Sequence, residues 1–279
     1  MENIITTQDE LYQAELNLDG GVSLATKEVQ RYALALRQGF SQISHAGVIS
    51  RRHILDIQAE LEQNNAGIRA LPGTQLKNDR TGEIIYTPPQ HPEEINRLMD
   101  NLLKFINDDE LSDLDPLVKM AVIHHQFESI HPFDDGNGRT GRILNILYLV
   151  VQGLLDLPIL YLSQYIIKNK QEYYRLLQVV RAQQDWESWI LYMLEGVTET
   201  ARDTINLIKE FKELMQRHKV RLRAEAPRIY SQDLLNNMFR HPYTKIEFVM
   251  TDLQVSRPTS TSYLSTLVNA CRNGFSRAA

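Results

Sequence analysis

The chain has 279 residues, 43% hydrophobic and 23% charged, which is typical of a globular protein with one large domain and a small one. A net charge of −5 argues against a protein that coats nucleic acid through general basicity. The single cysteine, Cys271, excludes an internal disulfide and favours a reducing, cytoplasmic location. The most apolar run, residues 143–155, is too short to span a bilayer, and the acidic N-terminus is not a signal peptide, so no membrane association is expected.

Amphipathic helices are predicted near the start of the chain. Apolar residues recur at helical spacing in residues 27–40 and 50–61, until residues 64–67 break the pattern. Thr7 and Glu10 form a capping-box pattern, which predicts a short helix that begins after Thr7.

Residues 71–92 have a different composition. Turn signals occur at Pro72 and at residues 79–82. Residues 74–78 and 83–87 flank the second turn, so we expect a short β-hairpin, with an ordinary surface loop as the alternative.

Two further helices lead towards the most polar stretch of the chain. Residues 92–106 are amphipathic, and Asp115 is placed to cap a helix of residues 116–130. His124 and His125 lie on that second helix, and we interpret both as packing residues rather than ligands.

The stretch from His131 to Arg142 combines an imidazole, two carboxylates, three glycines and two guanidiniums ahead of an apolar run, residues 143–151. The polar part predicts a loop and the apolar part a buried helix. A helix N-terminus presents unpaired N–H groups and a positive dipole end, and glycines there let a phosphate approach closely. Arg139 and Arg142 share one helix face, and their planar guanidiniums suit phosphate oxygens.

Other side chains of this stretch suit the same chemistry. Asp134 and Asp135 are hard oxygen ligands, fitted to a Mg²⁺ shared with substrate phosphates. His131, with an ordinary pKa near roughly 6.5, suits a general base. A base, a metal carboxylate, an anion site and two arginines together indicate attack on a nucleotide phosphate.

Three other interpretations explain less of this stretch. Gly136, Gly138 and Gly141 satisfy a dinucleotide-binding pattern, with Asp156 near the position of a ribose-binding acid, but no apolar strand precedes them. A zinc site built from the nearby histidines and aspartates lacks a recognisable ligand spacing. Helix capping explains a glycine or an aspartate, but not the arginines and the histidine together.

The remainder of the chain is predicted to be helical. Residues 161–168, 170–183 and 185–223 form three helices, the last with a long apolar stripe that could also mediate a homodimer. After a boundary near Pro227, three short helices follow, of which the last two have helix-turn-helix character. Few basic residues would face DNA, so packing is favoured over DNA reading. These helices span residues 231–239, 245–253 and 257–270.

The stretch from His131 to Arg142 resembles the signature of the Fic family, H-x-F-x-[D/E]-G-N-G-R-x-x-R, at every fixed position. The resemblance implies a mainly α fold, a Fic-type helical bundle with a small β-hairpin flap in residues 71–92. Most Fic proteins move AMP from ATP to a Tyr, Thr or Ser hydroxyl of a target protein and release pyrophosphate. The implied ligands are therefore ATP and Mg²⁺, and the implied partner is a target protein or the chain itself.

The resemblance also implies roles for individual residues. His131 would deprotonate the target hydroxyl, Phe133 would anchor the loop in the core, and Asp135 would hold Mg²⁺. Tyr174 would line the adenine site, with core packing as the alternative. Nucleotide phosphates would be bound by Gly136, Asn137, Gly138, Arg139, Thr140, Gly141 and Arg142.

Two further segments take their interpretation from the family. The flap would align a target strand by β-strand addition near His131, through Glu83, Ile84, Ile85 and Tyr86. The opening residues resemble the end of the inhibitory pattern [S/T]-x-x-x-E-[G/N], but the Ser/Thr before Glu2 is absent. Glu2 is therefore either a remnant inhibitor or an exposed terminal acid.

We expect residues 1–225 to form a Fic core, with the flap at 71–92, the motif loop at 131–142 and a long linking helix at 185–223. Residues 226–279 would form a partial winged-helix-like segment without its wing. The leading hypothesis is a protein adenylyltransferase. The alternatives are removal of AMP, transfer of another phosphate-containing group, or a non-enzymatic DNA-binding regulator, which the acidic charge disfavours.

Overall fold

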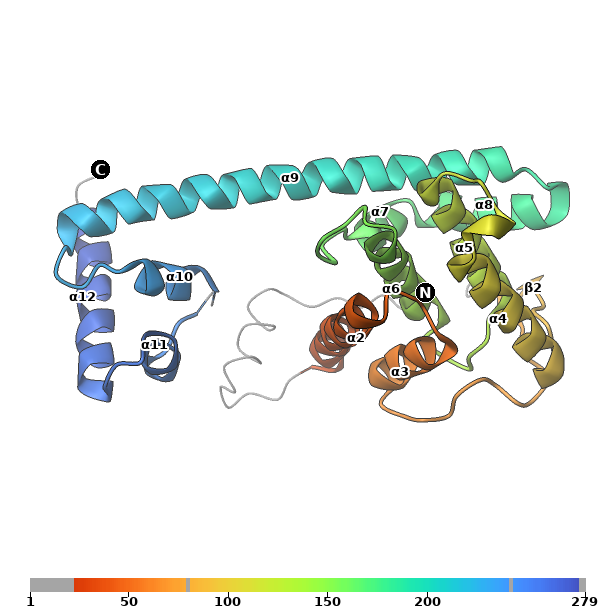
Figure 1. Cartoon of the computed structure of the whole chain (residues 1–279), viewed down its shortest axis with the longest axis horizontal. Helices are drawn as coiled ribbons and strands as arrows, with labels where there is room; N and C mark the ends of the chain where they lie inside the picture. The colour runs from red at the N-terminus through yellow and green to blue at the C-terminus, as the bar shows by residue number, and fades with distance from the viewer. Residues whose placement is uncertain (1–22, 79–80, 241–242, 276–279) are drawn as a thin grey trace. The chain divides into compact units, whose positions relative to one another are not determined.

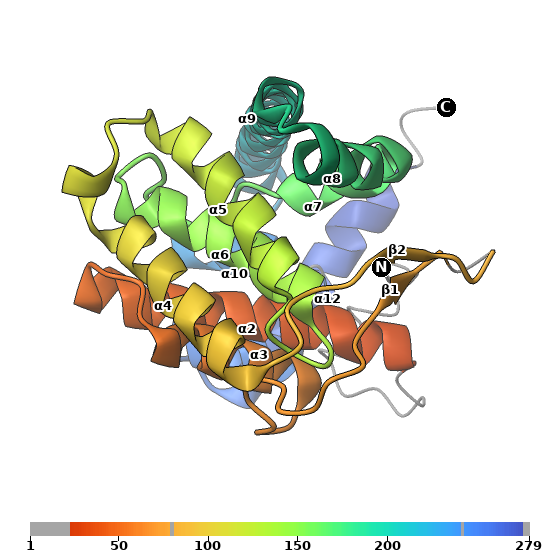
Figure 2. The same ribbon diagram turned by 90° about the vertical axis from the view of Figure 1, so that its right-hand side faces the viewer.

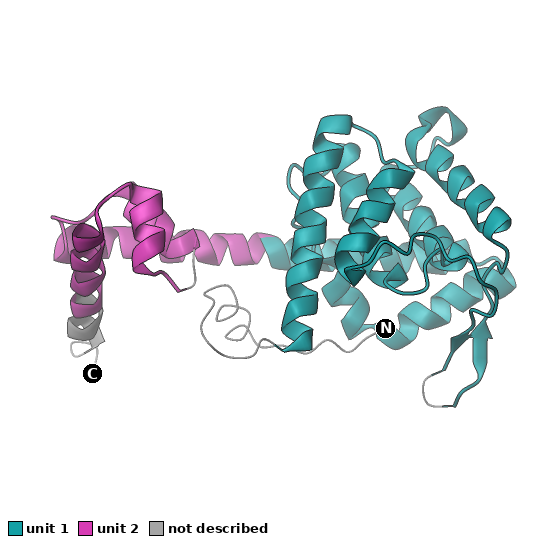
Figure 3. Ribbon diagram, turned by 90° about the horizontal axis from the view of Figure 1, so that it is seen from below, with its two compact units in different colours: residues 1–6, 23–204 teal, residues 7–22, 205–279 magenta. Residues whose placement is uncertain are grey.

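The computed structural model describes residues 23–78, 81–240 and 243–275, which fall into two compact units (Figure 3). Among these residues, unit 1 holds residues 23–204 and unit 2 holds those from 205 onward. The 40-residue helix α9 (Trp186–Glu225) contributes to both units. The boundary expected after residue 225 coincides with the end of this helix and stays a prediction.

The fold is mainly α, as the sequence predicts (Figure 1). Every α-helix in the described ranges corresponds to one that the sequence predicts, whereas the sequence does not predict the short 3₁₀ helix Asp109–Leu111. The helix expected at Thr7 lies outside the described residues. Unit 1 contains α2 (Leu24–Ala46), α3 (Arg51–Glu62), α4 (Pro92–Asn107), α5 (Pro116–Ile130), α6 (Asn137–Val151), α7 (Leu162–Lys168), α8 (Lys170–Gln183), the start of α9 and a 3₁₀ turn (Asp109–Leu111).

Helices α5 and α6 form the centre of unit 1. Figure 2 shows them between α2 and α3 on one side and α7, α8 and α9 on the other. The apolar run of α6 is covered on all faces, so Ile143, Leu147 and Tyr148 have no exposed surface. Asp115 caps α5 by accepting a hydrogen bond from the Leu117 N–H at 2.8 Å, as expected. Because other helices cover α5 and α6 on both sides, the end of α5 is fixed relative to the start of α6. The motif loop connects these two helix ends.

The flap is a two-stranded antiparallel hairpin, as predicted, rather than an ordinary loop. Strands β1 (Leu76–Lys77) and β2 (Ile84–Tyr86) pair with Leu76 opposite Tyr86. Gly82 has a φ of 71° in the turn and donates its N–H to the Asn78 carbonyl. The hairpin extends away from the helices (Figures 2 and 3), and Tyr86 at its base contacts Ser129 near the end of α5.

Unit 2 has its own apolar core. It contains the end of α9 with α10 (Gln232–Arg240), α11 (Ile246–Leu253) and α12 (Arg257–Phe275). Gln254, in the left-handed region at φ 54°, turns the chain from α11 into α12. In the described part of the chain, no helix combines the length and apolarity that a membrane crossing requires. The core residues of unit 2 are Leu222, Ala226, Ile229, Leu234, Leu235, Val249 and Leu267.

Candidate active site

His131 and Gly136 give the motif loop its shape. His131 ends α5 in the left-handed region, with φ 50° and ψ 59°, and donates its N–H to the Phe127 carbonyl at 3.0 Å. Gly136 precedes α6 at φ 80°, which favours glycine because the residue carries no Cβ. The chain therefore leaves one helix and enters the next within a few residues.

Asn137 stabilises this loop from inside. Its side-chain oxygen accepts the Phe133 N–H at 2.9 Å, and its side-chain nitrogen donates to the Phe133 carbonyl at 2.8 Å. Phe133 has no exposed surface and packs on Phe127, in keeping with its expected anchoring role. The amide side chain of Asn137 thus holds the loop, while the first N–H groups of α6 point out of the helix end, as they do in any α-helix.

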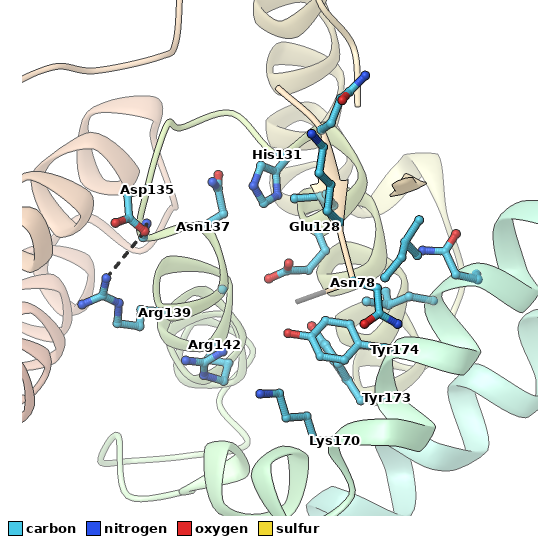
Figure 4. Close-up of a pocket in the computed structure, with 18 of the residues that line it drawn as sticks. Asn78, Glu128, His131, Asp135, Asn137, Arg139, Arg142, Lys170, Tyr173 and Tyr174 are labelled. Atoms are coloured by element: carbon cyan, nitrogen blue, oxygen red, sulfur yellow. Dashed lines mark hydrogen bonds and ion pairs between the residues drawn. The ribbon is translucent and has the colours of Figure 1, made fainter. Parts of the chain in front are cut away.

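A pocket of about 680 Å³ opens beside the start of α6 (Figure 4). Its volume lies within the usual range for small-molecule and cofactor sites. The motif loop, α5, α8 and the flap all contribute to its walls. Its lining includes Lys77, Asn78, Ile85, Glu128, His131, Asp134, Asp135, Gly136, Asn137, Gly138, Arg139, Arg142, Lys170, Tyr174, Gln178 and Arg181.

The imidazole of His131 faces this pocket. Burial, followed by the positive charges of Arg69 and Arg181, lowers the pKa of His131 to about 4. The imidazole is therefore neutral at pH 7, and a neutral imidazole is the form that accepts a proton. Its Nδ1 atom has no hydrogen-bond partner among the described residues.

The two motif arginines lie in different surroundings. Arg142 is 7% exposed, and its Nε and Nη1 atoms have no hydrogen-bond partner within the described ranges. Arg139 instead donates to Glu62 at 2.8 Å and lies 3.8 Å from both Glu28 and Asp135. A buried guanidinium with unused donors is costly, so the surroundings of Arg142 favour an anionic ligand.

The carboxylates at the pocket mouth could hold a metal ion only with help from a ligand. Asp135 is exposed and accepts the Gly136 N–H at 2.6 Å, and Asp134 lies beside it at the pocket wall. The described residues contain no cluster of three metal-ligating side chains. A Mg²⁺ ion with one or two carboxylates completes its shell with phosphate oxygens and water, and this donor set fits such an ion.

Thr140 and Gly141 are buried between α5 and α6 and are not among the described residues that line the pocket. A Cβ added at Gly141 would lie 3.0 Å from Glu128 Oε1 and 3.1 Å from the Phe127 ring. Gly141 therefore allows the close approach of the two helices. The expectation that both residues bind nucleotide stays a prediction.

Two tyrosines of α8, Tyr173 and Tyr174, line the pocket (Figure 4). Tyr173 also serves packing, because it is 1% exposed and hydrogen-bonds His124 Nε2 at 2.9 Å. Burial lowers the pKa of His124 to about 3 and that of His125 to about 4. Both histidines are buried against Trp189, in agreement with their interpretation as packing residues.

The predicted docking residues of the flap differ in their contacts. Ile84 and Ile85 are about half exposed, and Ile85 lines the pocket. Glu83 is exposed. Tyr86 is an anchor, because its hydroxyl donates to the Ser129 carbonyl at 2.9 Å and its ring lies against a guanidinium of α8. The suggested inhibitory residue, Glu2, lies outside the described residues.

Sequence reasoning missed several residues around the pocket. Glu128 is buried, burial raises the pKa of its carboxyl, and its Oε1 atom has no hydrogen-bond partner in the described part of the chain. Glu128 lies three residues before His131 in the sequence, and residues at this spacing share a helix face. The spacing could therefore have indicated that Glu128 lies near the pocket. Arg181, seven residues after Tyr174, carried a similar signal. Arg69, which contacts the motif loop, carried none.

Family comparisons agree with this geometry. Residues 48–149 match the Fic/DOC family, and residues 214–271 match the C-terminal domain of SoFic-like protein adenylyltransferases. Protein adenylyltransferase fic-1 of Caenorhabditis elegans is 32% identical over 176 residues, which cover 61% of this chain and 33% of that protein. A probable protein adenylyltransferase of Aquifex aeolicus is 36% identical over 89 residues, 32% of this chain and 24% of that protein. The chain thus spans a third or less of the length of these relatives.

Solved structures show the same fold. A Fic family protein from Desulfovibrio desulfuricans superposes with a TM-score of 0.62 at 21% identity, over 96% of this chain and 75% of that one. A fragment of Fic-1 from Caenorhabditis elegans superposes with a TM-score of 0.58 at 24% identity, over 75% of this chain and 60% of that one. The family match includes α3 to α5, α6 as far as residue 149, the flap and the complete His131–Arg142 signature. The chain therefore carries a Fic/DOC domain in residues 48–149 and a SoFic-like C-terminal domain in residues 214–271.

Proposed function

We propose that this chain is a protein adenylyltransferase that moves AMP from ATP to a Tyr, Thr or Ser hydroxyl of a target protein, or of itself. One observation carries the proposal: a single pocket brings together the neutral imidazole of His131, the N-terminus of α6 and the buried cation Arg142. The similar proteins from Caenorhabditis elegans and Aquifex aeolicus, which are named as a protein adenylyltransferase and a probable one, support the same activity.

The chemistry assigns a separate task to each group. His131 takes the proton of the target hydroxyl as its oxygen bonds to the α-phosphorus, and the bond from that phosphorus to pyrophosphate breaks. The N–H groups at the start of α6 stabilise negative charge on the phosphates. Arg142 binds the leaving pyrophosphate, and Arg139 joins it by exchanging its carboxylate partners for phosphate oxygens.

The other pocket residues position the substrates. Asp135 would hold a Mg²⁺ ion, which would neutralise phosphate charge when bound. Tyr174 offers a ring for the adenine base. The exposed Ile84 and Ile85 suit a target strand that adds to the flap, so its hydroxyl would lie near His131.

The test is incubation of the chain with ATP and Mg²⁺, followed by intact mass. We expect a gain of one AMP, or transfer to an added target, and no transfer by His131→Ala, which should still bind ATP. His45→Ala, an exposed histidine at the end of α2, is the matched control and should transfer normally. Transfer by His131→Ala would overturn the assigned role, and transfer from UTP but not ATP would overturn the assigned donor.

The C-terminal segment supports a narrower proposal. We infer that residues 226–279 form a partial winged-helix-like segment that serves packing rather than DNA reading. Arg257, at the start of α12, is paired with Glu247 at 3.3 Å, which reduces the positive charge there.

A cytoplasmic location is supported by the single cysteine. A homodimer through α9 is supported by the exposed Leu207 and Ile208.

A further inference from the structure

Arg69 joins two segments that are distant in sequence. It lies between α3 and β1 and is 1% exposed. Its Nε atom donates to the His131 carbonyl at 2.8 Å, and its backbone N–H donates to the Pro132 carbonyl at 2.9 Å. Its Nη2 atom donates to the Pro89 carbonyl, where the chain returns from the flap. One guanidinium thus binds both the motif loop and the base of the flap.

The flap base is itself cross-linked, so this contact acts on both strands. The Gln90 side chain accepts the Gly73 N–H at 2.7 Å and donates to the Thr74 carbonyl at 3.1 Å. These bonds connect the segment that enters β1 to the segment that leaves β2. A shift of Pro89 would therefore move the whole hairpin rather than one strand.

The motif loop has a particular need for external support. His131 adopts the left-handed region with φ 50°, which is strained for a residue with a Cβ. Such a conformation persists only when its surroundings hold it in place. The hydrogen bonds from Arg69 to the carbonyls of His131 and Pro132 hold the two consecutive peptide groups that follow the His131 side chain.

We propose that Arg69 is a positioning residue for the transfer: it holds the His131 backbone to the flap base, so that a target strand on the flap and the base that deprotonates it share one fixed register. The inference rests on the proposed adenylyl transfer. Arg69 lies outside the signature and is not among the described residues that line the pocket. Misplacement of reacting groups by about 1 Å can reduce a rate roughly 100-fold. A buried arginine that contacts no substrate can therefore control the rate of transfer through the position of His131.

Two substitutions separate position from charge. The positive charge of Arg69 lowers the pKa of His131, so Arg69→Met should raise that pKa. Arg69→Lys keeps the charge, but an ammonium group cannot reproduce the planar fork that reaches both carbonyls. A positioning role therefore predicts a reduced kcat in both variants, with a raised His131 pKa in the methionine variant alone.

The experiment measures kcat, ATP affinity, the His131 pKa by NMR and amide exchange of the whole chain. We expect kcat to fall about 10- to 100-fold in both variants with ATP affinity unchanged. Exchange should rise together in residues 76–86 and 131–136. Arg51→Met is the matched control, because Arg51 also binds a distant backbone carbonyl, that of Asn96 at 2.9 Å, but joins α3 to α4. It should change neither kcat nor exchange at the flap.

Several outcomes would overturn the proposal. These are a wild-type kcat in folded Arg69→Lys, exchange that rises in one segment alone, or the same loss of kcat in Arg51→Met. Arg69→Lys decides the matter if the methionine variant does not fold. If the unaltered chain transfers no nucleotide, the proposed function fails, and the exchange measurement still decides whether Arg69 couples the two segments.

Discussion

Burial has opposite consequences for the two central residues of the pocket. The imidazole of His131 loses its charge, because burial and two nearby guanidiniums lower its pKa to about 4. The guanidinium of Arg142 keeps its charge, because an arginine does not deprotonate in a protein. The pocket therefore combines a neutral base with a buried cation that has unused donors among the described residues.

The buried charge of Arg142 predicts opposite effects in the presence and absence of nucleotide. Arg142→Met should weaken ATP binding about 10-fold or more, because it removes charge-assisted hydrogen bonds to phosphate. The same change should raise the melting temperature without ATP, because it removes a buried guanidinium whose Nε and Nη1 atoms have no hydrogen-bond partner among the described residues. Isothermal titration and thermal melts measure both, with the exposed Arg202→Met as control. Unchanged ATP affinity would contradict the assignment.

The buried histidines predict acid sensitivity. Their pKa values are about 3 for His124 and 4 for His125 and His131, against an ordinary value of 6.5. Between these limits the unfolded chain binds protons that the folded chain excludes, so the free energy of unfolding falls as pH falls from 6.5 towards 4. His124→Asn should reduce that slope by up to about 1.4 kcal/mol per pH unit in urea titrations. An unchanged slope would contradict neutral burial of His124.

At the scale of elements, the junction of α5 and α6 positions the His131 imidazole and the anion site at the start of α6. The two helices approach closely at Gly141, and the motif loop connects them with His131 at one end and Gly136 at the other. The base and the anion site therefore belong to two rigid helices rather than to a free loop. The flap joins the same junction through Tyr86, which donates to the Ser129 carbonyl.

Two glycines of α6 predict different costs for the same substitution. Gly141→Ala should lower the free energy of unfolding by about 1–3 kcal/mol, because the added Cβ meets Glu128 and the Phe127 ring. Gly138→Ala, whose Cβ meets the movable end of Arg142 at 3.0 Å, should cost less stability but weaken ATP binding. Urea unfolding and ATP titration of both variants test this. Equal losses of stability would mean that Gly141 is not a packing position.

At the scale of the whole molecule, two separate apolar cores serve two units. The core of unit 1 surrounds α5 and α6, and that of unit 2 surrounds Leu234 and Leu235. The helix α9 supplies side chains to both, but no buried core residue belongs to both clusters in the described ranges. The site draws on unit 1 alone.

This separation predicts that core substitutions act locally. Leu234→Ala in unit 2 should lower stability by about 2–5 kcal/mol and leave ATP affinity unchanged. Leu147→Ala, an equally buried leucine of α6, should cause a similar loss and also weaken ATP binding. Denaturant unfolding with ATP titration distinguishes the two. Loss of ATP affinity in Leu234→Ala would show that the units act together.

The sequence by itself determined the helices, the hairpin and the signature. Apolar periodicity, capping residues such as Asp115 and the turn around Gly82 are properties of neighbouring residues, so they can be read locally. The run from His131 to Arg142 likewise places a base, an anion site and two arginines together, because a loop and one helical turn span it.

The tertiary structure alone decided which charges meet. Arg69 and His131 are 62 positions apart, and Arg139 and Glu62 are 77 apart. Nothing in the local pattern distinguishes Arg69 or Glu62 from ordinary surface residues. Their roles arise because the end of α3 and the base of the flap lie against the motif loop and the start of α6. Contacts between segments distant in sequence depend on how whole helices pack. The periodicity of one helix shows which of its faces is buried, but it does not show which other helix covers that face.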